Sequence, residues 1–143
     1  MTVIFSKRCE LGLQAVLYLS AQTDGKFLSA QEISEKLTQP KEFISKILQN
    51  LTTSGIVGSR KGTAGGFFLK ANPRELRLID IVRAIDGDEV FCKCVLGFPG
   101  CTVNKPCPVH NTWGKIREET FRMLSEQSLA DLKEKTIAKM ESM

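Results

Sequence analysis

The chain has 143 residues, of which 42% are hydrophobic and 25% charged, and its formal net charge is +4. This length fits one compact domain with an extension rather than two full-sized domains, and the composition excludes a wholly disordered chain. No apolar run approaches the ~20 residues of a membrane-spanning helix, and the N-terminus lacks the apolar core of a signal peptide, so we expect a cytoplasmic protein without a membrane partner.

Three helices are predicted before residue 55. Residues 7–22 are apolar nearly all round, which indicates a helix that is buried on most sides. Ser29 and Glu32 match a capping box that begins a short second helix. We expect Pro40 at the first position of a third helix, which Gly55 would end. Its apolar stripe consists of Phe43, Ile44, Ile47, Leu48 and Leu51.

A β-hairpin is predicted next. Residues 56–60 and 66–70 read as two short strands, and the segment 61–65 between them is basic and rich in glycine. A phosphate-binding loop would instead lead from a strand into a helix. The hairpin interpretation is therefore preferred.

The second half of the chain differs in composition and periodicity. Residues 78–85 predict a helix, residues 91–110 are rich in Cys, Gly and Pro without a period, and residues 111–126 are again helical. We expect Ser128 and Asp131 to cap a last short helix. Five positions that are alternately four and three residues apart have the spacing of a coiled-coil seam: Val109, Trp113, Ile116, Thr120 and Met123. The seam predicts pairing with a second copy of the chain, or alternatively packing on its own first helix.

The order helix, loop, helix and hairpin over residues 29–70 indicates a winged helix-turn-helix, so the fold class is mainly α with a small β wing. Residues 1–75 carry ten Lys and Arg against six Asp and Glu, which favours a polyanion partner. We expect double-stranded DNA, read by the third helix and the wing, with a palindromic operator if the chain is a homodimer. The alternative is a module that contacts proteins. The candidate DNA-contacting residues are Ser29, Gln39, Lys41, Glu42, Ser45, Lys46, Gln49, Arg60, Lys61, Gly62 and Thr63.

The irregular segment contains a candidate metal site. Cys94, Cys101, Cys107 and His110 offer four donors within 17 residues, and thiolates bind iron–sulphur clusters or zinc. The gaps of six and five residues are wide for structural zinc, which stays the alternative, as does a metal-free thiol switch. Cys107 and His110 also resemble a catalytic pair, but no third member is signalled, so we expect neither an enzyme nor a small-molecule substrate.

Four segments together resemble one known family. They are 29–37 (SAQEISEKL), 60–67 (RKGTAGGF), 78–87 (LIDIVRAIDG) and 107–113 (CPVHNTW). The sequence is similar to the Rrf-two-type winged-helix transcription regulators, which include IscR, NsrR and RirA, and most similar to the IscR-like iron–sulphur members. The resemblance runs from about residue 7 to residue 132.

The resemblance implies a homodimeric transcription regulator whose operator binding is controlled by an iron–sulphur cluster. It implies ligation by Cys94, Cys101 and Cys107, with His110 as the fourth ligand of a [2Fe–2S] cluster, favoured over [4Fe–4S]. Glu10 is a rival fourth ligand, donated by a partner subunit, and would favour [4Fe–4S]. The gap from Cys94 to Cys101 is one residue longer than in the IscR pattern. Cys92 is an alternative first ligand, but its gap to Cys101 is longer still, which makes it the second choice.

The expected organisation has two parts. Residues 1–75 are predicted to form the winged helix-turn-helix DNA-binding domain. Residues 76–143 are predicted to hold the sensor loop, residues 92–110, and the dimerisation helices. The start of the third helix differs from that of IscR, so the operator sequence does not carry over.

Overall fold

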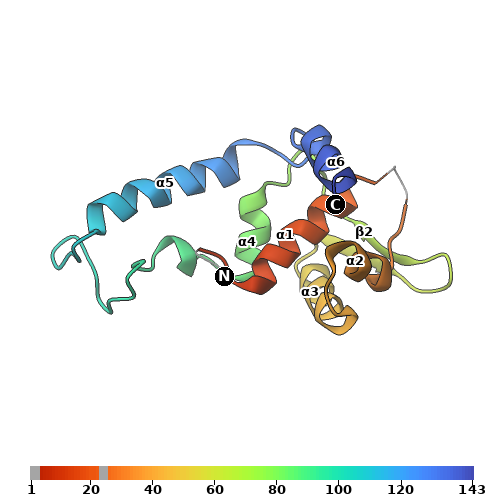
Figure 1. Cartoon of the computed structure of the whole chain (residues 1–143), viewed down its shortest axis with the longest axis horizontal. Helices are drawn as coiled ribbons and strands as arrows, with labels where there is room; N and C mark the ends of the chain where they lie inside the picture. Colours follow the sequence, from red (N-terminus) through yellow and green to blue (C-terminus); the bar gives the residue numbers. More distant parts are fainter. Residues whose placement is uncertain (1–3, 23–25) are drawn as a thin grey trace.

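The computed structural model describes residues 4–22 and 26–143, apart from the side chain of Val90. Within these residues it contains six α-helices, one short 3-10 helix and a two-stranded sheet (Figure 1). This confirms the predicted fold class, which is mainly helical with a small wing. In the described part of the chain, no helix combines the length and the apolar character that a membrane crossing requires.

Helix α1 (Lys7–Ser20) lies at the centre of the fold. It begins at Ser6, whose Oγ accepts a hydrogen bond from the backbone N–H of Cys9 at 3.1 Å. The helix packs against α2, α3, α4, α6 and β2. This explains its pattern, because Leu11, Ala15 and Val16 are almost completely buried. The prediction of burial on most sides is confirmed.

Helices α2 (Ala30–Leu37) and α3 (Lys41–Thr53) form the helix-turn-helix. The Oγ of Ser29 caps α2 by accepting the N–H of Glu32 at 3.0 Å, as the sequence predicts. The prediction for Pro40 was wrong by one position, because this residue is the extended N-cap of α3 rather than its first helical residue. Gly55 follows α3 with a φ of +84°, which matches its predicted role at the helix end.

The wing consists of β1 (Val57–Arg60) and β2 (Gly66–Leu69), which pair antiparallel with Arg60 opposite Gly66. Phe67 also pairs with Leu28, just before α2, through two backbone hydrogen bonds of 2.9 and 2.7 Å. The wing is thereby attached to both helices of the helix-turn-helix: to the start of α2 through Leu28, and to α3, which packs against β1.

The remaining elements are α4 (Leu78–Ile85), the 3-10 helix η1 (Glu89–Phe91), α5 (His110–Glu126) and α6 (Lys133–Glu141). Helix α4 packs on α1, α3 and α5, and α6 packs on α1. Ser128 and Asp131 do exchange hydrogen bonds of 3.0 and 3.2 Å, but they close a turn, because α6 begins only at Lys133. The expectation that this pair caps the last helix was therefore wrong.

Helix α5 extends away from the body of the molecule (Figure 1). Its one buried residue is Leu124, which packs with Cys9, Ile79 and Val82 in a second, smaller core. Leu124 does not belong to the predicted seam. Two seam residues of α5 are largely exposed, Ile116 at 49% and Met123 at 62%. The seam thus lies outside the contact between α5 and the body.

Candidate nucleic-acid interface and metal centre

The outer face of α3 is polar because its apolar residues all turn inward. Ile44, Ile47, Leu48 and Leu51 are buried. The expected contact residues lie on the opposite face. Lys41, Glu42, Lys46 and Gln49 are exposed, and Ser45 is half-buried. In the described part of the chain, none of these charged groups forms an ion pair. They are therefore available to base edges and phosphates.

The wing presents a second cationic surface. Arg60, Lys61, Gly62 and Thr63 are exposed at the end of β1 and in the loop that follows it. The guanidinium of Arg60 lies 5.9 Å from the ring centroid of Phe27, within the range of a cation–π contact. Phe27 was not predicted as part of this surface, since it lies outside any periodic segment.

Ser29 and Gln39 are placed differently from the other candidates. Both are half-buried. The hydroxyl oxygen of Ser29 is engaged as the cap of α2, and the backbone N–H of Gln39 donates to the carbonyl of Ser34 at 2.9 Å. The side chain of Ser29 thus positions the start of α2, and the backbone of Gln39 positions the turn before α3.

Three of the five cysteines converge. The Sγ atoms of Cys94, Cys101 and Cys107 all lie within 4.8 Å of one another, and those of Cys94 and Cys107 are 3.5 Å apart. A tetrahedral ion with Zn–S bonds of about 2.3 Å places its sulfurs about 3.8 Å apart. The donor set therefore fits a thiophilic metal centre.

His110 lies beside this group. Its Nδ1 is 3.2 Å from the Sγ of Cys101, and its backbone N–H donates to the carbonyl of Cys107 at 3.1 Å. His110 is the first residue of α5. The start of the helix thus brings the imidazole to the cysteines, as the spacing of the motif suggested.

The thiols of the group differ in acidity. Partial burial opposes ionisation of Cys94, but the backbone N–H groups of Phe98 and Leu96 and the neighbouring thiols outweigh it and lower its pKa to about 7. Burial raises the pKa of Cys107, and the contacts with Cys94 and Cys101 act in the same direction. The lowered pKa of Cys94 favours metal capture, because the thiolate is the ligand.

The alternative ligands lie outside this group. Cys92 is exposed and follows η1. Glu10 is in the first turn of α1, where its Oε2 lies 3.9 Å from the Nζ of Lys7. Cys9 is buried in the second core, and burial raises its pKa to about 12. Within one chain, the three converging cysteines and His110 are the donors that lie together.

Several side chains attach the sensor loop to the helices, and the sequence did not identify their role. The Nε1–H of Trp113 donates to the carbonyl of Lys93, the residue before Cys94, at 2.9 Å. The rings of Phe91 and Phe121 meet edge to face at 5.3 Å. Periodicity assigned Trp113 only to a helix seam, because a contact across 20 residues leaves no local pattern.

Arg83 connects the same region to α4. Its Nε donates to Asp88 Oδ1 at 2.8 Å, and its guanidinium lies 5.6 Å from the ring centroid of Phe121. One side chain of α4 therefore contacts both the segment that leads into the sensor loop and helix α5, which leads out of it.

Comparison with known proteins agrees with this arrangement. A family model described as "Rrf2: Iron-dependent Transcriptional regulator" matches residues 5–135. An HTH-type transcriptional regulator of Aquifex aeolicus is 28% identical over 132 residues, which cover 91% of each chain. The regulator NsrR of Oceanobacillus iheyensis is 24% identical over 127 residues, covering 88% of this chain and 86% of NsrR.

Solved structures show the same fold. The global cysteine regulator CymR of B. subtilis matches with a TM-score of 0.75 at 21% identity, covering 93% of this chain and 98% of CymR. IscR of T. potens matches with a TM-score of 0.67 at 24% identity, covering 89% of this chain and 83% of IscR. The family match spans the helix-turn-helix, the wing and the cysteine loop, and the chain belongs to the Rrf2 family of transcriptional regulators.

Proposed function

We propose that the chain is a homodimeric regulator whose binding to operator DNA is controlled by an iron–sulphur cluster in the sensor loop, residues 92–110. The observation that carries this proposal is the convergence of three thiols within 4.8 Å, with an imidazole 3.2 Å from one of them. The division into a DNA-binding part, residues 1–75, and a sensor and dimerisation part, residues 76–143, belongs to the same proposal.

Cys94, Cys101, Cys107 and His110 would hold the group, and three thiolates with one imidazole suit a [2Fe–2S] cluster. Such a cluster, when bound, supplies a centre that responds to redox state and to the supply of iron. The protein's own side chains couple the site to the loop. The four donors lie together only in the present conformation of the loop between η1 and α5, so the site and the loop conformation depend on each other.

The loop is connected to the DNA-binding part by contacts that support coupling. Trp113 fixes the backbone beside Cys94, and Arg83 joins α4 to both ends of the loop region. Helix α4 packs on α3, the proposed recognition helix. A change in the loop therefore reaches α3 through one intervening helix. Typical coupling energies are about 1–3 kcal/mol, or roughly 5–150-fold in affinity.

Exposed apolar residues on α5 support the homodimer. Ile116 and Met123 of the seam are 49% and 62% exposed, and Phe121 is 38% exposed. Ile116 and Met123 are seven residues apart, so they lie on one face of α5 and form an apolar row that a second helix can cover. A second copy is the occupant that we propose, because a two-fold dimer would present two recognition helices to the half-sites of a palindrome. Ile116→Glu together with Met123→Glu should convert a dimer to a monomer in analytical ultracentrifugation, and an unchanged mass would exclude this interface.

The DNA-binding half is tested by salt dependence. Lys46→Ala on α3 and Lys61→Ala on the wing should each weaken operator binding and reduce the slope of log K against log salt by about one, because each lysine is proposed to meet a phosphate. Lys139→Ala on α6 is the matched control and should leave the slope unchanged. Unchanged slopes in both test variants would remove α3 and the wing as the DNA-binding surface.

The cluster is tested by the visible spectrum of protein purified without oxygen. Sulphide-to-iron charge-transfer bands are expected, and Cys94→Ser should abolish them whereas Cys92→Ser should not. His110→Ala should alter the spectrum, whereas Glu10→Ala should leave it unchanged. The opposite pattern would assign the fourth position to Glu10. Protein that stays colourless after reconstitution with iron and sulphide would refute the cluster.

A second candidate is a mononuclear zinc site, which would make the loop a structural element rather than a sensor. The mutual closeness of all three Sγ atoms, within 4.8 Å, favours it, because the ligands of a single ion lie that close together. Zinc predicts a colourless protein with one metal ion per chain by elemental analysis. Operator affinity would then not respond to oxidants that leave the zinc bound.

A further inference from the structure

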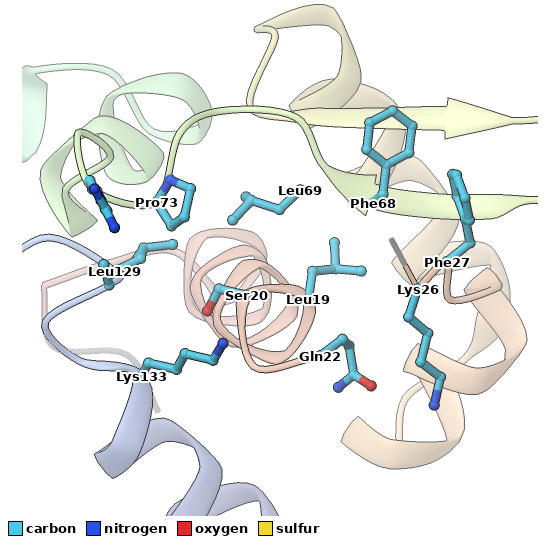
Figure 2. Close-up of a pocket in the computed structure, with 12 residues that line it drawn as sticks. Leu19, Ser20, Gln22, Lys26, Phe27, Phe68, Leu69, Pro73, Leu129 and Lys133 are labelled. Atoms are coloured by element: carbon cyan, nitrogen blue, oxygen red, sulfur yellow. The ribbon is translucent and has the colours of Figure 1, made fainter. Parts of the chain in front are cut away.

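A cavity of about 410 Å³ lies at the base of the wing, away from the cysteine loop and from α3. Its walls come from the end of α1, the end of β2, the turn before α4 and the start of α6 (Figure 2). The volume falls within the range of small-molecule sites, which is about 300–1,000 Å³. No role in the cluster site or in the proposed DNA contacts accounts for it.

The floor of this cavity is apolar. Leu19 is 5% exposed and Leu129 is fully buried, and Leu69 completes the surface between them. Phe27 and Phe68 stand together at one end (Figure 2), with their rings edge to face and their centroids 5.1 Å apart. This surface suits an aromatic or branched apolar body.

The rim is cationic. Lys26, Arg74 and Lys133 line it, and the described lining residues include no carboxylate. Among the residues that the structure describes, none of the three cations has a carboxylate within 4 Å. Figure 2 shows Lys133 reaching from the start of α6 across the end of α1. An apolar floor beneath three cations that have no ion pair within the described residues favours an anion with an apolar body.

Polar groups of α1 add hydrogen-bonding capacity. The hydroxyl of Ser20 donates to the carbonyl of Leu17 at 2.7 Å, so its oxygen can still accept. The Nε2 of Gln22 donates to the carbonyl of Tyr18 at 3.0 Å, which leaves one amide hydrogen and the Oε1 for a ligand. The cavity thus combines a few polar groups with an apolar lining, as small-molecule sites do.

We propose that this cavity is an effector site for a small organic carboxylate with an aromatic or branched apolar body. The carboxylate would lie near Arg74 and Lys133 and the apolar body against Phe68 and Leu129. A ligand held there would contact the wing and α6 together. The segment after the wing and the segment before α6 are joined near the cavity by two backbone hydrogen bonds of 2.9 Å, from Ala130 N–H to the carbonyl of Pro73 and from Leu129 N–H to the carbonyl of Leu76. Its binding would therefore bias the position of the wing and change operator affinity.

The first test is binding of phenylacetate, followed by calorimetry, with the neutral 2-phenylethanol as the comparison ligand. We expect saturable binding of one phenylacetate per chain, and binding of the alcohol about tenfold weaker or worse. Arg74→Ala together with Lys133→Ala should weaken phenylacetate binding by at least about tenfold. Lys139→Ala, on the same helix but lining a different hollow with Leu17 and Met140, should bind phenylacetate as the original chain does.

Three results would overturn the proposal: no saturable binding, equal binding of acid and alcohol, or equal loss in Lys139→Ala. Circular dichroism melts verify that each variant is folded. The binding measurement needs neither DNA nor a cluster, so its failure is separate from a failure of the proposed function. Operator affinity unchanged by saturating phenylacetate would refute the effector role. A double variant that loses DNA affinity but keeps phenylacetate binding would instead make these cations DNA contacts.

Discussion

Gly66→Ala is a substitution for which the structure predicts a large local effect on the wing. Gly66 has a φ of +141°, a conformation that residues with a side chain rarely adopt. A Cβ at this position would lie 2.7 Å from the carbonyl oxygen of Leu28. That carbonyl accepts the N–H of Phe67 at 2.7 Å, so the methyl group would be forced against the contact that joins the wing to the start of α2.

The loss of folding stability caused by Gly66→Ala has two contributions, the strained backbone conformation and the lost hydrogen bonds. A backbone held in a sparsely populated conformation costs about 1–3 kcal/mol. Relieving the clash separates Phe67 from Leu28 and loses two hydrogen bonds, worth about 0.5–1.5 kcal/mol each. Gly66→Ala should therefore lower the free energy of unfolding by about 2–6 kcal/mol, measured by urea denaturation followed by circular dichroism. Operator affinity should fall as well, because the wing loses its attachment.

Gly114→Ala is the matched control. A Cβ at Gly114 would meet nothing within 4 Å, and the residue lies inside α5. Replacing a helical glycine by alanine should stabilise the protein by about 0.5–1 kcal/mol. The same chemical change should thus have opposite signs at the two sites. A Gly66→Ala protein as stable as the original, with the original DNA affinity, would refute the assignment of strain to Gly66.

Three further predictions follow from contacts already described. Trp113→Phe removes the hydrogen bond to the carbonyl of Lys93, worth about 0.5–1.5 kcal/mol, so limited proteolysis should cut the sensor loop roughly 2–10 times faster while the far-ultraviolet circular dichroism stays unchanged. Burial raises the pKa of Cys9 to about 12, so the protonated thiol's contribution to stability is complete below about pH 9 and is lost as the pH rises toward 12; Cys9→Ala should flatten that part of the pH profile. The N–H and hydroxyl of Ser128 lower the pKa of Asp131, so Asp131→Ala should lower the Tm at pH 7, and the difference should shrink as the pH falls below about 4.

Each of these predictions has its own contradicting result. Equal proteolysis rates would show that the Trp113 contact does not hold the loop. Parallel alkaline profiles of the original chain and Cys9→Ala would assign the pH dependence to other groups. A difference in Tm that persists below pH 3 would mean that Asp131 acts through packing rather than through its charge.

The elements of the fold were largely predictable because their signals are local. The inward stripe of α3 follows from apolar spacing within 13 residues, and the start of α2 follows from Ser29 and its neighbour three residues on. Both depend on hydrogen bonds or packing within a turn or two of helix. The polar face of α3 and the basic wing follow from the same patterns, since residues that do not point inward must point to solvent.

The contacts that close the site were not predictable in the same way. Spacing identified four donors, but not that Cys94 and Cys107, 13 residues apart, would lie in contact while Cys92 stays outside. Glycine and proline in this segment permit many loop closures, and the sequence does not select among them. The bridge between Leu28 and Phe67 was missed for a similar reason, because Leu28 belongs to no strand-like run.

The contacts that connect α4, η1 and α5 indicate how large a change in operator affinity the loop could cause. The exposed ion pair of Arg83 with Asp88 contributes about 0–1 kcal/mol, its contact with the Phe121 ring about 0.5–1 kcal/mol, and the aromatic pair of Phe91 with Phe121 about 0.5–1.5 kcal/mol. Together these contacts amount to about 1–3.5 kcal/mol. Breaking these three contacts alone could shift operator affinity by no more than about 400-fold. A larger measured effect would require further contacts to change as well, such as the packing of Leu124 in the second core or the proposed dimer interface.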